Sequence, residues 1–167
     1  MSIDSYTSTY HRLITMLEDS GVKYDLLEHA AEGRTIAASA VRGHPASQAA
    51  KCMVVEIRIE RYALCVVPGD SRVNLDAVRD IYGGVRARLA PQQIAESLTA
   101  CESGTIIPFS FRPAELEVIA DPGILEQRQM FFNAARLDRS LAMSVDDFMQ
   151  VSRPQLAVIA DRLPGAA

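Results

Sequence analysis

Hydrophobic and polar residues alternate most regularly between positions 53 and 59. The apolar positions of this segment fall on one face of an extended backbone: Met53, Val55, Ile57 and Ile59. This period of two predicts a half-buried β-strand. The next segment, residues 62–67, is continuously apolar, which is typical of a central strand, and Pro68-Gly69-Asp70 follows it as a turn.

Other segments carry the periodicity of helices. Apolar residues three or four apart near the start of the chain predict a first helix over residues 4–20: Tyr6, Tyr10, Leu13 and Leu17. Further helices are expected over 35–41, 75–82, 91–98, 145–151 and 154–163, and further strands over 22–28, 85–89, 116–120, 130–133 and 140–143. Asn74 and Ser144 are suitable N-caps for two of these helices. Helical connections between apolar strands favour an α/β or α+β fold with a mixed sheet over an all-β barrel.

Length, charge and cysteine content narrow the class of protein. At roughly 100–200 residues per domain, the 167 residues predict a single domain over 1–167. The net charge of −4 excludes a protein that holds nucleic acid mainly through a broad basic surface. No signal peptide is expected, and no apolar run approaches the roughly 20 residues of a membrane helix. Three cysteines without metal-ligand spacing indicate reduced thiols and a cytoplasmic location: Cys52, Cys65 and Cys101.

Lysine is rare in this chain, and one of its two lysines has an unusual position. Lys51 lies two residues before Met53, so strand alternation places it on the apolar face. A lysine there can project into a cavity, stabilise a developing oxyanion, or act as a base or nucleophile. The alternative is a strand-entry lysine whose ammonium reaches solvent past Ala49 and Ala50. Lys23, at the start of a strand, is expected at the surface.

The segment Gly104-Thr105-Ile106-Ile107-Pro108-Phe109, here called the Gly104 loop, is a second candidate site. Gly104 permits backbone conformations that other residues resist, and Pro108 stiffens the opposite end of the loop. Such a loop can direct backbone N–H groups at a carbonyl or phosphate oxygen. The alternative is a connection that carries an apolar plug into the core.

Two polar residues near expected strand ends are weaker candidates. His29 is a candidate substrate-binding residue or an ordinary edge histidine. Asp138 lies between Arg136 and Arg139, a pattern typical of a surface turn with weak ion pairs. The three histidines lack metal-ligand spacing, so no metal site is expected.

Seven segments match the landmarks of a known family in their order along the chain. They are the lysine strand (residues 50–55), the following strand and turn (66–70), the helix that begins at Asn74 (74–78), the segment before the next helix (88–90), the Gly104 loop, the closing strand (137–140) and the helix after it (144–148). This ordered set resembles the YbaK-like family of aminoacyl-tRNA deacylases, which includes the editing domain inserted in bacterial prolyl-tRNA synthetases. The resemblance spans residues 13–151.

The resemblance implies a mixed, barrel-like sheet surrounded by helices, with a pocket between the lysine strand and the Gly104 loop. It implies a freestanding trans-editing enzyme that hydrolyses the ester of a mischarged tRNA. Lys51 would be the key catalytic or substrate-positioning group. The loop from Gly104 to Pro108 would hold the aminoacyl moiety. The expected substrate-binding residues are His29, Gly104, Thr105, Ile106, Pro108 and Asp138. Because an ester is already activated, no metal and no cofactor are expected.

The expected partner is the 3′ aminoacyl end of a mischarged tRNA. An aminoacyl-tRNA synthetase is a second candidate partner. Binding to a membrane or to DNA is not expected. Contacts to tRNA would come from local arginines or from that synthetase. The candidate arginines are Arg86, Arg88, Arg128 and Arg136. The bulky Ile106-Ile107 pair leaves the preferred amino acid open. Two alternatives also stay open: a catalytically silent module that binds an amino-acid-like ligand or a protein partner, and Schiff-base chemistry at Lys51.

Overall fold

The computed structural model describes residues 3–84 and 86–164, with side chains from residue 9 onward. The α-helices of these ranges are α1 (Ile3–Asp19), α2 (Thr35–Arg42), α3 (Leu75–Ile81), α4 (Gln92–Thr99) and α5 (Val145–Ser152). The strands are β1 (Tyr24–Glu28), β2 (Ala50–Arg58), β3 (Arg61–Pro68), β4 (Ser71–Val73), β5 (Arg88–Leu89), β6 (Leu116–Ala120), β7 (Gln129–Arg136), β8 (Arg139–Ser144), β9 (Gln155–Leu156) and β10 (Ala160–Arg162). Two short 3-10 helices are η1 (Ala46–Gln48) and η2 (Pro122–Glu126).

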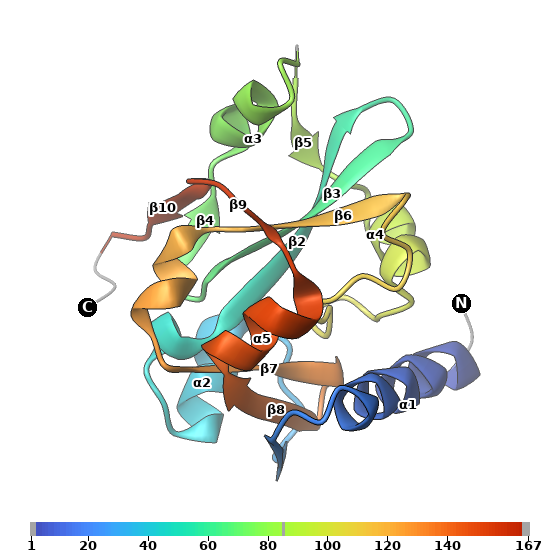
Figure 1. Ribbon diagram of the computed structural model, residues 1–167, viewed down its shortest axis with the longest axis vertical. Helices are drawn as coiled ribbons and strands as arrows, with labels where there is room; N and C mark the ends of the chain where they lie inside the picture. The colour runs from blue at the N-terminus through green and yellow to red at the C-terminus, as the bar shows by residue number, and fades with distance from the viewer. Residues whose placement is uncertain (1–2, 85, 165–167) are drawn as a thin grey trace.

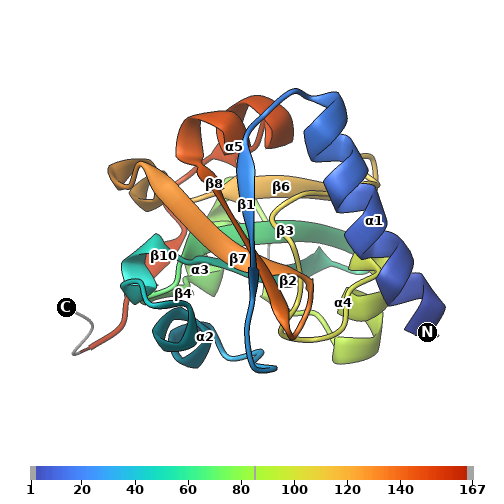
Figure 2. The same ribbon diagram turned by 90° about the horizontal axis from the view of Figure 1, so that it is seen from below.

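The strands form a mixed sheet with smaller sheets beside it (Figure 1). The five-stranded sheet has the order β5-β2-β3-β6-β9; β2 and β3 are antiparallel, whereas β3 and β6 are parallel. Strands β1, β8 and β7 form a three-stranded sheet, and β10 pairs with β4. An isolated bridge between Ala49 and Phe131 joins the two larger sheets. In Figure 2 the helices lie around these strands. The predicted mixed α/β fold is therefore confirmed.

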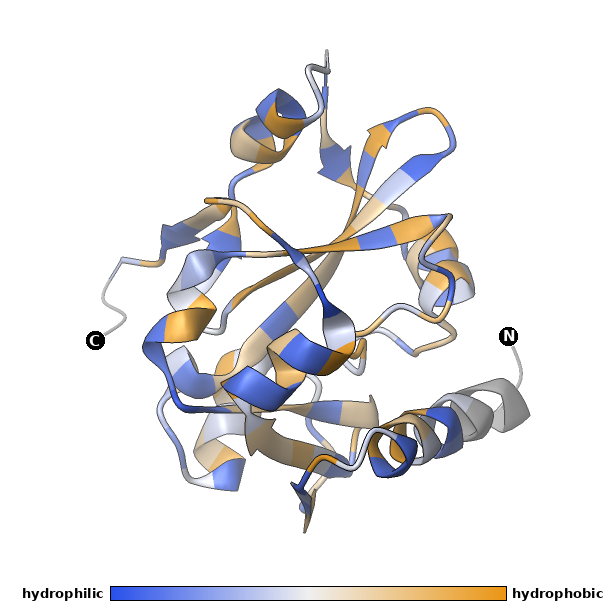
Figure 3. Ribbon diagram, in the orientation of Figure 1, coloured by the Kyte–Doolittle hydropathy of each residue, from blue (hydrophilic) through white to orange (hydrophobic). Residues whose placement is uncertain are grey.

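Strand β3 lies at the centre of the five-stranded sheet, as its continuous apolar run predicts. Hydrophobic residues are concentrated in the central strands and mixed with hydrophilic ones on the helices (Figure 3). The two faces of the sheet pack into separate apolar clusters. Leu64 and Val66 belong to the larger one, and Cys65 and Val67 to the smaller one.

The prediction that β2 is half-buried is wrong. Val54 packs into the larger cluster and Val55 into the smaller one, and even Glu56 is only 9% exposed. The alternation fails again at the end of the strand. A register shift between Glu56 and Arg58 leads into the turn to β3, so Ile59 is 87% exposed instead of inward-facing.

The predicted first helix is confirmed as α1, which packs against β7. Leu13 and Leu17 are fully buried and Tyr10 nearly so, whereas the side chain of Tyr6 lies outside the described residues. Both expected caps are present. Asn74 Oδ1 accepts the Ala77 N–H at 2.9 Å, and Ser144 Oγ accepts the Asp147 N–H at 3.0 Å.

The C-terminal segment corrects another expectation, because the helix predicted over residues 154–163 is absent from the described chain. Strand β9 instead adds to the sheet beside β6, and β10 pairs with β4. Asp121 Oδ2 accepts the N–H groups of Ile159 and Ala160, each at 2.9 Å, and the Ile159 side chain is fully buried. Sheet pairing and one buried carboxylate thus outweigh local helical propensity.

The other elements match the expectations with small shifts of their ends. The strand expected over residues 85–89 is reduced to β5, and Val85 lies outside the described residues. Among the described helices, none combines the length and the apolar character needed to cross a membrane.

Candidate active site

A cavity of about 550 Å³ opens beside the N-terminal half of β2. Strand β5 pairs with β2 at Val55 and Glu56, and the Ala90 N–H donates to the Val54 oxygen. In the described chain no strand pairs with this edge of β2 at residues 51–53. The residues that line the cavity come from β2, α2, β7 and the connecting loops, and include Gly33, Arg34, Thr35, Ile36, Arg42, Ala50, Lys51, Cys52, Met53, Ser103, Gly104, Ile106, Phe132 and Asn133. A cavity of this size suits a small organic group.

Lys51 lines the cavity on the face of β2 that the alternation predicts. It pairs with Val67 across the β2–β3 ladder, on the side of the smaller apolar cluster. Its ammonium donates one long hydrogen bond, 3.4 Å, to the backbone oxygen of Ser71. Among the described residues no carboxylate lies within ion-pair distance of it. The charge therefore remains available to a ligand.

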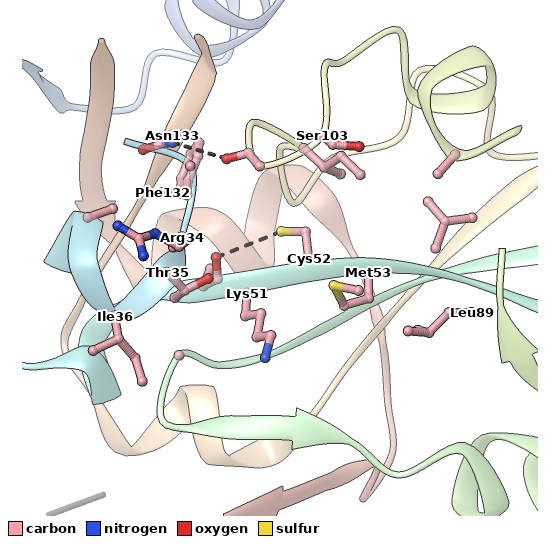
Figure 4. Close-up of a pocket in the computed structure, with 18 of the residues that line it drawn as sticks. Arg34, Thr35, Ile36, Lys51, Cys52, Met53, Leu89, Ser103, Phe132 and Asn133 are labelled. Atoms are coloured by element: carbon pink, nitrogen blue, oxygen red, sulfur yellow. Dashed lines mark hydrogen bonds between the residues drawn. The ribbon is translucent and has the colours of Figure 1, made fainter. Parts of the chain in front are cut away.

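Cys52 projects from the opposite face of β2, toward Asn133 (Figure 4). Its thiol donates to the Ala50 backbone oxygen at 3.9 Å. Burial, and to a smaller extent the neighbouring Cys101, raises the pKa of the Cys52 thiol far above its ordinary value. The neutral thiol is a poor nucleophile, so its place on the cavity wall does not make it a catalytic cysteine.

The Gly104 loop forms the wall on the Cys52 side. Gly104 adopts φ +87°, and Ile106 lines the cavity beside it. Thr105 faces away from the cavity: its hydroxyl donates to the Glu102 backbone oxygen at 2.7 Å. Pro108 is buried outside the lining, and its backbone oxygen accepts the Ser152 hydroxyl at 3.1 Å. Two of the four candidate residues of the loop therefore reach the cavity directly.

His29 and Asp138 do not line the cavity. His29 Nε2 lies 2.7 Å from Ser140 Oγ, and the His29 N–H donates to the Asp138 backbone oxygen at 3.1 Å. The Asp138 carboxylate accepts two hydrogen bonds from Arg136, at 2.9 and 3.2 Å. This pair lowers the pKa of Asp138. The structure thus brings Lys51, Gly104 and Ile106 to one cavity and leaves these two residues behind its wall.

The charged residues that line the cavity within the described chain are all cations: Arg34, Arg42 and Lys51. Arg34 also pairs with Glu32, at 3.1 Å. Within the described residues, the hydrogen-bond partners of Arg42 are all neutral. Its burial lowers the pKa of the guanidinium to about 10, so it stays charged at neutral pH. A chain with net charge −4 therefore has a locally positive cavity, which favours an anionic ligand.

The arginines expected from the sequence to contact tRNA do not line this cavity. Arg88 pairs with Glu56, and Arg136 with Asp138. Sequence reasoning missed Arg42 and Asn133. Asn133 carried a usable signal, because it is a polar residue inside the apolar strand β7.

The cavity lining favours a reaction in which water or a group of the substrate attacks, rather than one that uses a general base or a metal ion held by the protein. Its described lining includes no histidine and no carboxylate that would act as a general base. Among the described residues, no group of three or more His, Cys, Asp or Glu side chains is placed to hold a metal ion. What the lining supplies is cations, backbone polar groups and neutral hydrogen-bonding side chains.

Comparisons with known proteins identify relatives of this chain. The family model of the aminoacyl-tRNA editing domain matches residues 11–151. The multifunctional Ser/Thr-tRNA deacylase ProXp-y of Escherichia coli is 33% identical over 152 residues, which cover 89% of this chain and 90% of that protein. A proline–tRNA ligase of Bacillus cytotoxicus is 35% identical over 78 residues, which cover 47% of this chain and 13% of the ligase.

Solved structures share the fold at lower identity. The hypothetical protein APE2540 superposes with a TM-score of 0.82 at 20% identity, covering 90% of this chain and 99% of its own. A proposed trans-editing enzyme for prolyl tRNA synthetase superposes with a TM-score of 0.78 at 20% identity, covering 96% of this chain and 99% of its own.

Proposed function

Because this chain belongs to the aminoacyl-tRNA editing domain family, we propose that it is an aminoacyl-tRNA deacylase that acts in trans on mischarged tRNA. The observation that carries the proposal is the 33% identity along 90% of the E. coli Ser/Thr-tRNA deacylase. That relative makes seryl- and threonyl-tRNA the first substrates to test. The partial match to a proline–tRNA ligase supports a prolyl-tRNA synthetase as the companion enzyme. The expected cytoplasmic location remains part of this proposal.

The electrostatics of the cavity suit the acceptor end of a tRNA. Arg42 and Lys51 face it without a carboxylate partner among the described residues, and Arg34 faces it while paired with Glu32. The terminal nucleotides bring phosphate charge, which such cations attract even when the protein as a whole is acidic. The amino acid would lie against Gly104 and Ile106, with the ribose toward the open edge of β2.

Lys51 is proposed as the group that contacts the substrate at its reacting ester. An ammonium has three protons, and Lys51 uses one of them in a long hydrogen bond to Ser71. Figure 4 shows Lys51 and Cys52 on opposite faces of β2, so the substrate would extend across the strand edge to meet both Lys51 and the Gly104 loop. At that position the cation stabilises the negative charge that develops on the carbonyl oxygen.

The chemistry requires no covalent enzyme intermediate. A water oxygen attacks the ester carbonyl carbon, the ester C–O bond breaks, and the ribose oxygen leaves with the proton that the water gives up. If the neighbouring ribose hydroxyl attacks first, the acyl group only moves to that hydroxyl, and a water then hydrolyses the new ester in the same way. The net reaction consumes one water and yields free amino acid and tRNA. The neutral Cys52 thiol takes no part in this step.

Incubation of the purified chain with a panel of mischarged tRNAs, including seryl- and threonyl-tRNA, tests the proposal. Release of amino acid faster than in buffer from at least one of them is expected. If all of them keep their amino acid while tRNA still binds, the chain is a binding module rather than a hydrolase.

A further inference from the structure

A buried asparagine connects two segments that form the cavity wall. Asn133, on β7, is 7% exposed and lines the cavity. Its amide nitrogen donates to the backbone oxygen of Glu32 at 2.8 Å. It also donates to the backbone oxygen of Gly104 at 3.0 Å, the dashed line at Asn133 in Figure 4. These two acceptors are 72 positions apart in the chain (104 − 32). One side chain therefore ties the segment before α2 to the Gly104 loop.

The oxygen of the same amide also has two hydrogen-bond partners. Asn133 Oδ1 accepts from Ser140 Oγ at 2.9 Å and from Arg42 Nη1 at 3.1 Å. All four hydrogen-bonding positions of the amide are thus used. Rotating the amide by half a turn would face its N–H groups toward the donors of Ser140 and Arg42, so the surroundings fix its orientation.

The residues that orient Asn133 are anchored in turn. Arg42 Nε donates to His44 Nε2 at 2.8 Å, and the His44 ring stacks on Phe131 at a centroid distance of 3.8 Å. Ser140 Oγ lies 2.7 Å from His29 Nε2. The network therefore includes residues of α2 and β8 and the residue that follows β1. These elements fix the orientation of the Asn133 amide.

The backbones that Asn133 joins touch each other at two glycines. A Cβ built on Gly104 would lie 2.9 Å from the Cα and the oxygen of Gly33. Removing the amide donors would leave the carbonyls of Glu32 and Gly104 without this bridge. One side chain thus donates to both segments beside their point of contact.

We propose that Asn133 is a positioning residue: its amide clamps the Glu32-Gly33 segment to the Gly104 loop and so sets the shape of the pocket for the aminoacyl group. The effect on catalysis rests on the proposed deacylase function, whereas the clamp itself does not. Arg42 and Ser140 act through Asn133 by fixing which way its amide points.

Asn133→Asp is the sharpest variant, because it keeps the shape and the two acceptor contacts but loses both N–H donors. Its kcat for seryl- or threonyl-tRNA is expected to fall at least about tenfold, whereas KM changes little because the contacts to the tRNA body remain. Hydrogen exchange of the Thr105 amide, which donates to the Glu102 oxygen at 2.9 Å, is expected to accelerate about tenfold as the loop opens. Gln129→Glu is the matched control, since it makes the same amide-to-carboxylate change at an exposed position of β7, and it should change neither readout.

Wild-type kcat in a folded Asn133→Asp chain would overturn the catalytic part, and wild-type exchange at Thr105 would overturn the clamp. If Asn133→Asp does not fold, Ser140→Ala removes one of the two groups that orient the amide; it should lower kcat about threefold, and an unchanged kcat would contradict the proposal. If the wild-type chain deacylates no tRNA, the proposed function fails, and the exchange measurement alone then decides whether the clamp exists.

Discussion

Gly33 and Gly104 lie in backbone contact, because a Cβ on Gly104 would approach the Gly33 Cα to 2.9 Å. Such a distance leaves no space for a side chain, and the φ of +87° at Gly104 strains any other residue as well. The pocket wall near the proposed aminoacyl site therefore depends on the absence of a side chain at Gly104.

Gly104→Ala is expected to lower the free energy of unfolding by roughly 1–3 kcal/mol and to reduce deacylation at least tenfold. Gly21→Ala is the matched control, because Gly21 also has positive φ (+70°) but no atom within 4 Å of its added Cβ. Urea unfolding and a deacylation assay on both variants separate backbone strain from the clash. Equal activity in the two variants would show that the glycine contact does not shape the pocket.

Ile106 and Ile107 are neighbours with different environments: Ile106 lines the cavity, whereas Ile107 is only 1% exposed and packs into the core. Ile106→Ala is expected to change the ratio of rates on seryl- and threonyl-tRNA by up to about tenfold, the effect of one methyl group in an apolar pocket. Ile107→Ala should leave that ratio unchanged while destabilising the fold by about 2–5 kcal/mol. A ratio altered by Ile107→Ala alone would contradict the assignment of Ile106 to the pocket.

His44 makes stability depend on pH. Burial, with a smaller contribution from the nearby Arg42 charge, holds the pKa of His44 below its ordinary value of 6.5, although its hydrogen bond to Pro45 opposes this. As pH falls from 7 to 5, the unfolded chain takes up a proton more readily than the folded chain, so the His44 contribution to stability is lost with acidification.

His44→Gln removes this titration and retains an acceptor for Arg42. The melting temperature of the wild-type chain should fall by roughly 1–3 °C more than that of the variant between pH 7 and pH 5. Thermal unfolding at both pH values measures the difference. An identical fall in both chains would assign the acid sensitivity to other groups.

The positive cavity predicts salt-dependent tRNA binding. Arg34→Gln should weaken tRNA binding and lower the slope of log affinity against log salt by up to about 0.7, the value for one phosphate contact on a single strand. Arg79→Gln is a suitable control, because Arg79 pairs with Asp76 and Asp80 on α3 and does not line the cavity. An unchanged slope in Arg34→Gln would remove Arg34 from the tRNA contact.

Local patterns predicted most of the fold. The apolar run of β3, the caps at Asn74 and Ser144 and the face of Lys51 all follow from nearest-neighbour chemistry. The final segment did not, because its strands depend on pairing with β6 and β4 and on the distant Asp121 carboxylate. The exposure of Ile59 was not predicted for a similar reason. A register shift within the β2–β3 pairing places it in the turn, and the alternation of apolar residues does not reveal that shift.

The candidate site, too, was predictable from the sequence only in part. Lys51, Gly104 and Ile106 reach the cavity, as expected from strand alternation and from the family resemblance. Asn133 and Arg42 became visible only in three dimensions, because their roles depend on contacts between residues about 30 to 100 positions apart. His29 and Asp138 lie near the same network but behind the wall, a distinction that sequence order does not encode.

Deacylation by Lys51→Ala and Lys23→Ala, compared with the wild-type chain on the same mischarged tRNA, tests the proposed reaction most directly. Lys51 makes one long hydrogen bond and Lys23 is exposed, so both variants should fold. Lys51→Ala is expected to lower kcat by about 100-fold, the typical effect of losing one oxyanion donor, while Lys23→Ala matches the wild type. A Lys51→Ala chain that deacylates at the wild-type rate would contradict the role of this cavity's lysine in catalysis.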